Sequence, residues 1–334
     1  MKGVITMNYS RRVYNRAAAV LEKRRYQAEH DQRMHRQEAY SSIPELAAID
    51  REIASAGAEV IKAIGMGENA QTFIDDLSKR NLAAQKHRED MLKAAGYPKN
   101  YLDADYVCKK CRDTGFVNGV MCECYKKLLR DTALAELNEL SLGDGSTFEN
   151  FSLDYYPDTN DANGVNPRRK MSEILNFCKS YAEDFDTDSS SLLMCGATGL
   201  GKTHLSLAIA RVAVEKGYGV IYGSAQNLMS RLEKERFSNQ RDNEYGGSEQ
   251  ALLECDLLII DDLGAEFSTQ FTVSALYNII NTRMMSRLPV IISTNLMPDE
   301  LERKYTQRIT SRIIGNYISL FFCGKDIRQL KNSD

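Results

Sequence analysis

The sequence predicts an α/β fold with a parallel sheet, preceded by a helical region that carries a small metal-binding segment. In the C-terminal half, short apolar runs alternate with amphipathic stretches of helical spacing, the pattern of a parallel α/β sheet. A glycine-rich stretch, Gly196–Thr203, joins one of these runs to the helix that follows it. In the N-terminal half, helical periodicity dominates, and four cysteines cluster within 17 residues between Cys108 and Cys124.

Length and charge indicate two units. A chain of 334 residues is long enough for two domains of ordinary size. Residues 1–130 contain 23 Lys/Arg and 17 Asp/Glu, a net charge of +6, whereas residues 131–334 contain 20 and 29, a net charge of −9. A charge of +6 over 130 residues is not a strong signature of nucleic-acid binding. We therefore expect a mildly basic front unit and an acidic back unit.

The chain has no sequence feature of a membrane or secreted protein. Its apolar runs all fall well short of the roughly 18 residues that a membrane span requires, and Met1–Arg12 contains no apolar signal core. We expect a cytoplasmic protein without a membrane partner. Clustered cysteines in such a protein indicate metal binding rather than disulfide bonds.

Three helical stretches are expected at residues 8–40, 44–64 and 69–95. In the first stretch, helical spacing is seen for Val13, Ala17, Val20 and Leu21. In the third, the candidate core positions are Phe73, Ile74, Leu77, Leu82 and Met91. This pattern leaves two interpretations open: a helical module with a solvated charged face, or a module that docks onto a partner.

The cysteine segment, residues 106–125, predicts a zinc site. Cys108 and Cys111 have the two-residue spacing of a zinc knuckle, and Cys122 and Cys124 are separated by one residue. Asn118-Gly119 between the pairs is a type I′ hairpin signal that would fold one pair back onto the other. Four thiolates leave no open position, so the metal would be structural; four free thiols are the alternative.

The boundary between the units is expected where the helical pattern ends. A helix over residues 126–142 is followed by the break Gly143–Ser146, and residues 154–169 have the composition of a loop. We expect a helical partner-binding domain at 1–130, a linker at 131–150 and an α/β domain at 151–334. Phe148 and Phe151 either pack in the core, the preferred interpretation, or border an adenine pocket.

Gly196-Ala197-Thr198-Gly199-Leu200-Gly201-Lys202-Thr203 fits the phosphate-loop pattern G-x-x-x-x-G-K-S/T. An apolar strand precedes the loop and a helix-forming stretch follows it, which is the context that the motif requires. Its glycines allow backbone N–H groups to surround a phosphate at a helix N-terminus. Lys202 would contact the β- and γ-phosphates, and Thr203 would ligate Mg²⁺. The chain is therefore expected to bind a nucleoside triphosphate.

Two later strands end in polar residues that belong at the same sheet edge. The strand at 255–262 ends in Asp261, which would serve Mg²⁺, and Asp262, which would orient or deprotonate the attacking water. Because Asp is one methylene shorter than Glu, Glu266 is a candidate to assist. Asn295, after the strand at 289–295, would bind the γ-phosphate or the water, or would cap a helix.

Arg308 and Arg312 lie four residues apart on one face of an expected helix. Facing the phosphates of a neighbouring subunit, they would stabilise transition-state charge as an arginine finger. The alternative is a pair of surface salt bridges to Glu300 or Glu302. Further strands at 219–222 and 317–323 bring the expected sheet to five.

Together these residues resemble the AAA+ ATPases, and within them the DnaC/DnaI-type replicative helicase loaders and their IstB relatives. The resemblance covers residues 146–328, and it implies the roles of Walker A, Walker B, sensor 1 and arginine finger for the motifs above. The nucleotide-binding positions that it implies are Gly196, Thr198, Gly199, Gly201, Lys202, Thr203, His204 and Asp261. The 11 residues after Cys323 are too few for the helical lid of most AAA+ proteins, which is also similar to the loaders.

The cysteine segment, with Asp113-Thr114-Gly115-Phe116, is similar to the zinc-bearing region of DnaI-like loaders. The resemblance implies an ATPase that uses ATP, Mg²⁺ and Zn²⁺, self-associates, and loads a replicative hexameric helicase onto single-stranded DNA. The DNA contacts that it implies within 224–250 are Arg231, Lys234, Arg236, Phe237 and Arg241; a solvated basic face is the alternative. Other readings are an IstB-type transposition helper and a non-hydrolysing nucleotide-gated adaptor, the latter because Asp262 replaces Glu.

Overall fold

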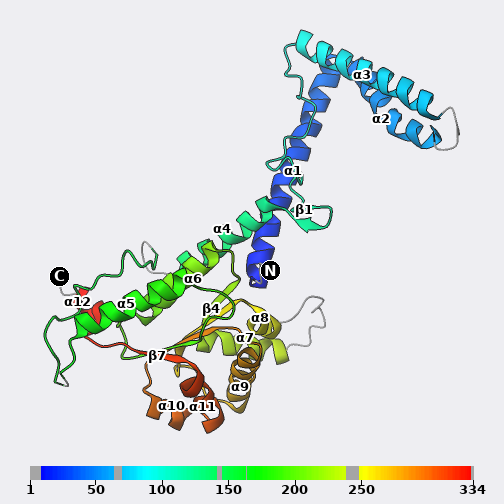
Figure 1. Ribbon diagram of the computed structural model, residues 1–334. Helices are drawn as coiled ribbons and strands as arrows, with labels where there is room; N and C mark the ends of the chain where they lie inside the picture. The colour runs from blue at the N-terminus through cyan, green and yellow to red at the C-terminus, as the bar shows by residue number, and fades with distance from the viewer. Residues whose placement is uncertain (1–8, 64–69, 141–144, 163, 238–247, 332–334) are drawn as a thin grey trace. The chain divides into compact units, whose positions relative to one another are not determined.

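A computed structural model of the chain describes residues 9–63, 70–140, 145–162, 164–237 and 248–331 (Figure 1). The chain divides into two compact units, residues 18–124 and residues 1–17 together with 125–334. We refer to the first as the helical unit and to the second as the α/β unit. Within the described ranges, no helix combines the length and apolar character needed to cross a bilayer.

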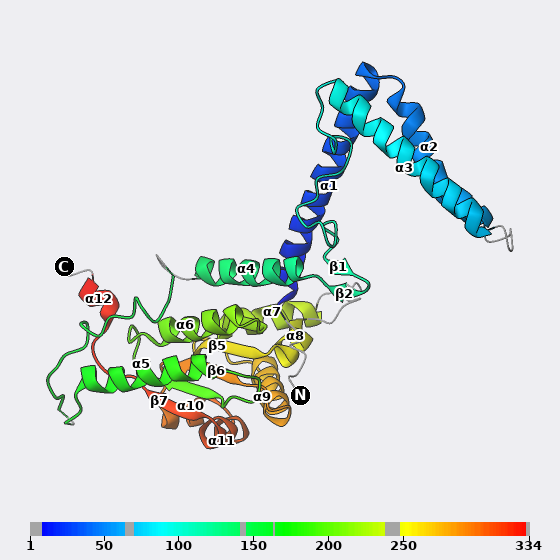
Figure 2. The ribbon, with the colours of Figure 1, turned by 45° about the horizontal axis from the view of Figure 1, so that its top comes forward.

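The helical unit contains most of α1 (Arg11–Ser42), together with α2 (Leu46–Ala63) and α3 (Ala70–Ala94), and α2 and α3 pack side by side (Figure 2). A small core forms where the end of α1 meets the start of α2 and the end of α3. It is built from Ala39, Leu46, Leu92 and Leu102. The expected helical N-terminal region is thereby confirmed.

Two predicted core positions of α3 are exposed instead. Ile74 and Leu82 have 36 and 62% of their surface accessible. A helix that packs against a single neighbour buries only one stripe of its surface, so apolar residues outside that stripe face solvent. On α3 the buried stripe consists of Leu77, Ala84 and Leu92.

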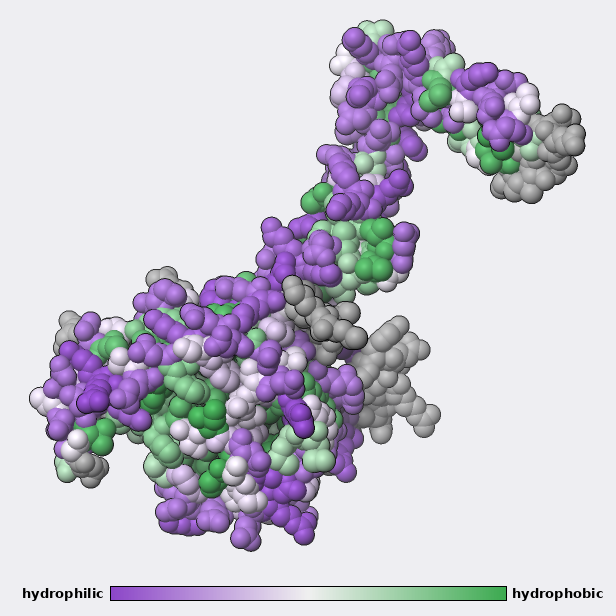
Figure 3. Space-filling model, in the orientation of Figure 1, coloured by the Kyte–Doolittle hydropathy of each residue, from purple (hydrophilic) through white to green (hydrophobic). Residues whose placement is uncertain are grey.

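A two-stranded antiparallel hairpin, β1 (Phe116–Val117) and β2 (Val120–Met121), lies between the cysteine pairs. Its turn residues Asn118 and Gly119 have φ values of 51° and 78°, as a type I′ turn requires. The segment exposes an apolar surface, which we call the hairpin surface, visible in Figure 3. It consists of Val107, Phe116, Val117 and Val120.

The α/β unit is built on a parallel five-stranded sheet in the order β4-β5-β6-β3-β7, which confirms the predicted fold class. Its strands are β3 (Leu192–Cys195), β4 (Val220–Ser224), β5 (Leu257–Leu263), β6 (Val290–Thr294) and β7 (Ile318–Phe321). Its helices are α4 (Glu123–Leu140), α5 (Pro167–Glu183), α6 (Lys202–Glu215), α7 (Ala225–Phe237), α8 (Ser248–Glu254), α9 (Gln270–Met285), α10 (Pro298–Lys304), α11 (Gln307–Asn316) and α12 (Ile327–Lys331).

Alternate residues of the central strands point to opposite faces of the sheet, and both faces are buried. Leu258 and Ile260 of β5 belong to a core that they share with residues of α7, α8 and α9. Leu257 and Ile259 point to the other face, where α6 packs against β4, β5 and β6. Burial on both faces explains why these strands are continuous apolar runs rather than alternating ones.

Helix α5 begins inside a segment whose composition predicts a loop. Asn166 caps the helix by accepting a hydrogen bond from the backbone N–H of Arg169, and Pro167 occupies the first helical position. Polar and proline residues therefore mark a helix start here rather than a continuing loop. The short helices α8 and α12 have no sequence signal either, because seven and five residues are too few for a periodic pattern. A helix does follow Asn295, but its N-cap is Met297 rather than Asn295.

Arg283 of α9 is fully buried and joins three elements of the α/β unit. Its Nη1 donates to the carbonyl oxygens of Leu252 and Cys255, both at 2.9 Å, and its Nη2 donates to that of Pro289 at 2.8 Å. The guanidinium thus satisfies carbonyl groups at the end of α8 and just before β5 and β6.

We predict that Arg283→Leu destabilises the α/β unit by about 3–5 kcal/mol, because it leaves buried carbonyl groups without a donor. The loss is measured from urea unfolding of the full-length protein. Arg303→Leu, at an exposed position on α10, is the control and should change the free energy of unfolding by less than about 0.5 kcal/mol. Equal effects of the two substitutions would contradict the role of Arg283.

Candidate nucleotide site and cysteine cluster

The glycine-rich loop connects β3 to α6 through backbone conformations that favour glycine. Gly196, Gly199 and Gly201 have φ values of 148°, 77° and 87°. A Cβ on Gly196 would lie 2.7 Å from the carbonyl oxygen of Phe322, and one on Gly201 would lie 2.7 Å from the ring of Phe151. Conformation and crowding both require glycine at these positions. The loop leads into the N-terminus of α6, where the first backbone N–H groups have no partner within the helix and can bind an anion.

Lys202, the first residue of α6, connects this loop to the end of β6. Its Nζ donates to the carbonyl oxygens of Gly196 and Ala197, each at 2.7 Å, and to Asn295 Oδ1 at 2.8 Å. Burial lowers the pKa of Lys202, while the nearby carboxylates Asp261 and Asp262 act in the opposite direction. All three N–H donors of the ammonium group are used, so a phosphate oxygen would have to replace one of these acceptors.

Asp261, near the end of β5, is held by hydroxyl groups from three elements. Thr203 Oγ1 lies 3.1 and 3.0 Å from its two carboxylate oxygens. Tyr222 of β4 donates to Oδ2 at 2.6 Å, and Ser293 of β6 donates to Oδ1. The hydroxyl and carboxylate that would share a Mg²⁺ ion are therefore already adjacent.

Asp262 adopts a backbone conformation that is uncommon for a residue with a side chain, with φ at +51°. Its N–H donates to Ser293 Oγ at 2.9 Å, and the pairing of β5 with β6 is irregular between Ile260 and Leu263. Burial raises the pKa of Asp262, and the charge of Asp261 adds to this effect. The irregularity sends the Asp262 side chain into the cavity described next.

A cavity of about 390 Å³ links these groups, which is a size typical of small-ligand sites. Its polar lining includes Lys202, Thr203, Asp261, Asp262 and Asn295. Its aromatic and aliphatic lining includes Phe151, Tyr155, Leu207 and Ile327. A ligand with both a phosphate chain and a flat base matches this mixed lining.

Most of the predicted nucleotide-binding residues reach this cavity. Those that line it are Thr198, Gly199, Gly201, Lys202, Thr203, His204 and Asp261. Gly196 lies behind it and contributes its carbonyl oxygen to Lys202. Phe151 also lines it, which is the interpretation that the sequence pattern disfavoured, while Phe148 is simply buried. The ring of His204 lies against Phe151, with centroids 5.4 Å apart.

Glu266 does not reach the cavity. Its carboxylate is buried, where it accepts hydrogen bonds from the N–H of Gly264 at 2.8 Å and from the hydroxyl of Tyr305. The first bond spans only two residues and folds the chain back after β5, so the side chain turns inward. This buried position gives no support to the prediction that Glu266 assists Asp262.

The two arginines of α11 also lie away from the cavity of their own chain. Arg312 donates from Nε to Asn281 Oδ1 at 2.9 Å and from Nη2 to the hydroxyl of Tyr277 at 3.1 Å. Its Cζ lies 4.9 Å from the centre of the Tyr277 ring. Arg308 is exposed, and within the described ranges neither arginine forms the alternative ion pair with Glu300 or Glu302.

The structure adds two residues that the sequence did not single out. Arg328 of α12 lines the cavity, and the N–H of Ile327 beside it donates to the carbonyl oxygen of Gly199 at 3.1 Å. Tyr222 contacts Asp261, as described above. A basic residue near the end of the chain and a tyrosine in an apolar strand carry no motif, so only their positions in the fold identify them.

The candidate DNA contacts on α7 are partly engaged within the protein. Arg231 lies 3.6 Å from Glu235, and Arg236 lies over the ring of Phe271 at 5.4 Å. Lys234 is exposed. Arg241 and the side chain of Phe237 lie outside the described residues, so DNA binding here stays a prediction.

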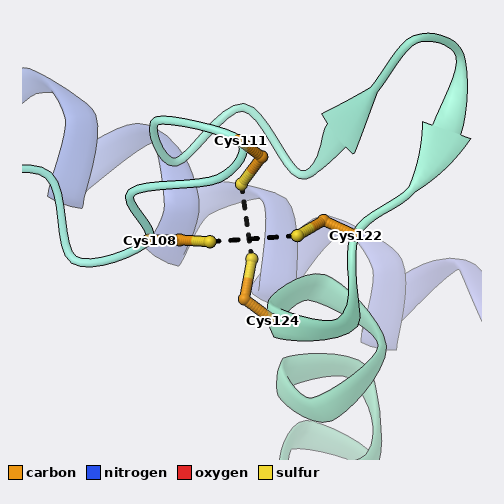
Figure 4. Close-up of side chains that lie close together, drawn as sticks. All are labelled: Cys108, Cys111, Cys122 and Cys124. Atoms are coloured by element: carbon orange, nitrogen blue, oxygen red, sulfur yellow. Dashed lines mark hydrogen bonds between the residues drawn. The ribbon is translucent and has the colours of Figure 1, made fainter.

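The four clustered cysteines point toward a common centre (Figure 4). Their Sγ atoms lie within 4.8 Å of one another, with Cys108–Cys122 at 3.8 Å and Cys111–Cys124 at 3.4 Å. Tetrahedral zinc with Zn–S bonds of about 2.3 Å separates its sulfur ligands by about 3.8 Å, whereas a disulfide needs about 2.05 Å. The residues present therefore fit a Zn²⁺ ion.

Backbone and side-chain groups support this cluster. Asp113 is buried and accepts hydrogen bonds from the N–H groups of Val107 and Cys108 at 2.8 and 3.0 Å, which fixes the first knuckle. A hydrogen bond from the backbone of Cys111 lowers the pKa of Cys108 to about 7, whereas burial and the neighbouring thiols raise the pKa of Cys124. A thiol that ionises near neutral pH is a better metal ligand than an ordinary one.

Part of the α/β unit is similar in sequence to known proteins. Residues 161–314 match the family model of the IstB-like ATP binding protein. The replicative helicase loader DnaC of Escherichia coli K12 is 29% identical over 153 residues, which cover 44% of this chain and 60% of DnaC. The uncharacterized protein YdaV of the same strain is 28% identical over 142 residues, covering 42% of this chain and 56% of YdaV.

Two solved structures overlap with about half of this chain. The DnaC helicase loader superposes with a TM-score of 0.43 and 21% identity, over 53% of this chain and 98% of that one. DnaI superposes with a TM-score of 0.42 and 18% identity, over 54% and 89%. The family match begins at residue 161, so the helical unit lies outside it.

We predict that the purified chain contains about one zinc per molecule, because four cysteine ligands complete a tetrahedral site. Elemental analysis measures the metal. Cys111→Ser should reduce it at least severalfold, whereas Cys178→Ser, a buried cysteine of α5, should leave it unchanged. A metal content well below one in the unmodified protein would rule out the zinc site.

Proposed function

Because the chain carries an IstB-like ATP-binding domain over residues 161–314, we propose that it hydrolyses ATP to load a replicative hexameric helicase onto single-stranded DNA. One observation carries the proposal. The matched segment contains Lys202, Asp261 and Asn295, and these three side chains converge on one cavity. Its similarity to DnaC supplies the process in which the ATPase would act.

In this proposal the polar residues that line the cavity have roles in phosphoryl transfer. Lys202 would bind the β- and γ-phosphates, Thr203 and Asp261 would hold Mg²⁺, and Asn295 would position the γ-phosphate. Mg²⁺, when bound, would supply positive charge that neutralises the phosphates. The aromatic side chains of Phe151 and Tyr155 would take the adenine base.

Asp262 is the residue that would orient the attacking water. Among the described residues that line the cavity, the carboxylates are Asp261 and Asp262, and Asp261 is already held by three hydroxyl groups. Asp262 is left with its side chain in the cavity and its backbone fixed by Ser293. Its short side chain supports slow turnover, and the absence of any turnover despite ATP binding would indicate a nucleotide-gated adaptor instead.

Arg312 is proposed to act on the site of a neighbouring copy of the chain. It lies outside its own cavity, on the α9–α11 surface, where Asn281 and Tyr277 hold the guanidinium group in place. An arginine that is ordered before assembly loses little freedom when it meets a phosphate. This arrangement would make hydrolysis depend on self-association.

The hairpin surface is proposed as the contact for the helicase. Val107 and Val120 have 68 and 67% of their surface accessible, far more than apolar residues of a covered segment would have. Lys110 and Arg112 are exposed in the same segment and give it a basic rim. A zinc ion bound to the four cysteines would keep this small surface rigid enough for docking.

We predict that Arg312→Ala binds ATP normally but hydrolyses it at least about 100-fold more slowly, because an arginine finger stabilises charge only in the transition state. Binding is measured with a fluorescent ATP analogue, and turnover by phosphate release. Arg303→Ala on exposed α10 is the control.

Mixing the Arg312→Ala protein with the Lys202→Ala protein tests whether the site is shared between two copies of the chain. At a shared interface, the intact arginine of the Lys202→Ala chain can complete the intact pocket of the other chain. Partial recovery of turnover is expected. Its absence would argue against a site shared between copies.

We predict that the double variant Phe116→Asp/Val120→Asp loses co-purification with a replicative hexameric helicase by at least about tenfold, because carboxylates replace the apolar contact. Leu82→Asp, at an equally exposed apolar position on α3, should retain it. The zinc content and the ATP affinity of all three proteins are measured in parallel. Undiminished binding by the double variant would refute docking at the hairpin surface.

A further inference from the structure

Tyr222 lies on β4, the edge strand of the sheet, on the same face as Asp261. In the β4–β5 register Tyr222 pairs with Ile259, and Asp261 follows two residues later on β5. Residues two apart on a strand point to the same face, and a long side chain reaches its diagonal neighbour. The tyrosine hydroxyl reaches Asp261 Oδ2 at 2.6 Å in this way.

The contacts of Asp261 are not equivalent once a metal is bound. Thr203 has one hydroxyl proton and contacts both carboxylate oxygens, and metal ligation would turn its lone pairs toward the ion. Tyr222 on Oδ2 and Ser293 on Oδ1 remain as donors from the two flanking strands. They restrain the carboxylate from opposite sides of β5.

The side chain of Tyr222 is half-buried. It lines a second cavity of about 250 Å³ in the α/β unit, together with Val13 from the start of α1, Leu137 of α4 and Leu228 of α7. At neutral pH an ordinary tyrosine hydroxyl is protonated and donates one hydrogen bond. This single donor on Oδ2, opposite Ser293 on Oδ1, favours one orientation of the carboxylate.

We propose that Tyr222 is a positioning residue of the metal site: its hydroxyl orients Asp261 for Mg²⁺ without contacting the ion or the nucleotide. The inference rests on the proposed function, since it requires that Asp261 serves the metal. Residues that orient a metal ligand from behind commonly change metal affinity or activity 10- to 100-fold when removed. An aspartate that holds Mg²⁺ through a bound water restrains the ion less than a direct ligand does. We therefore expect a change in Mg²⁺ affinity near the lower end of this range.

The test is Tyr222→Phe in the full-length chain, which removes the hydroxyl and keeps the ring. ATP-analogue fluorescence is titrated with Mg²⁺, and the affinity for the analogue is measured separately in EDTA. The half-saturating Mg²⁺ concentration should rise about tenfold, while the affinity in EDTA stays within twofold. Tyr218→Phe, whose ring packs on Phe185 near the start of β4, is the control and should change neither value.

Each result has a distinct meaning. A Mg²⁺ response within twofold of the unmodified chain would overturn the inference while leaving the proposed function intact. A parallel loss of affinity with and without Mg²⁺ would also overturn it, because it would show that the hydroxyl supports the fold rather than the metal. Failure of the unmodified chain to bind the analogue at all would overturn the proposed function, and the inference with it.

Discussion

The position of β6 between β3 and β5 is the constraint on which the candidate site depends. Because the three strands are parallel and adjacent, their carboxyl ends meet at one edge of the sheet. The glycine-rich loop after β3, the aspartates at the end of β5 and Asn295 after β6 are thereby brought together from positions nearly 100 residues apart in the chain. A strand order that separated β6 from β3 would hold Asn295 away from Lys202, which it contacts here.

The buried charges of the site balance one another through this arrangement. Lys202 is desolvated on its helix but lies near Asp261 and Asp262, and Arg328 adds a second positive charge from α12. Removing either the cationic side chains or the carboxylates would leave an uncompensated charge in a partly buried site, which is costly. A triphosphate with its metal carries several negative charges, so two cationic side chains around the same cavity suit that class of ligand.

The second half of the proposed mechanism lies outside this cavity. Arg312 is ordered on the α9–α11 surface, and the hairpin surface is exposed on a segment held by four cysteines. Each feature has a cost for an isolated chain: ordering the long Arg312 side chain loses conformational entropy, and the apolar side chains of the hairpin surface face water. Both are expected of a protein that acts between partners.

The sequence by itself determined the parallel α/β class, the loop that would bind phosphate, the paired aspartates and the cysteine cluster, because each has a local pattern of spacing or periodicity. It also predicted the hairpin, since Asn118-Gly119 favours one turn type. Only the tertiary structure decided that Phe151 borders the cavity, that Glu266 turns away from it, and that Tyr222 and Arg328 belong to its surroundings. These assignments depend on strand order and chain reversal, and no local pattern of residues records either.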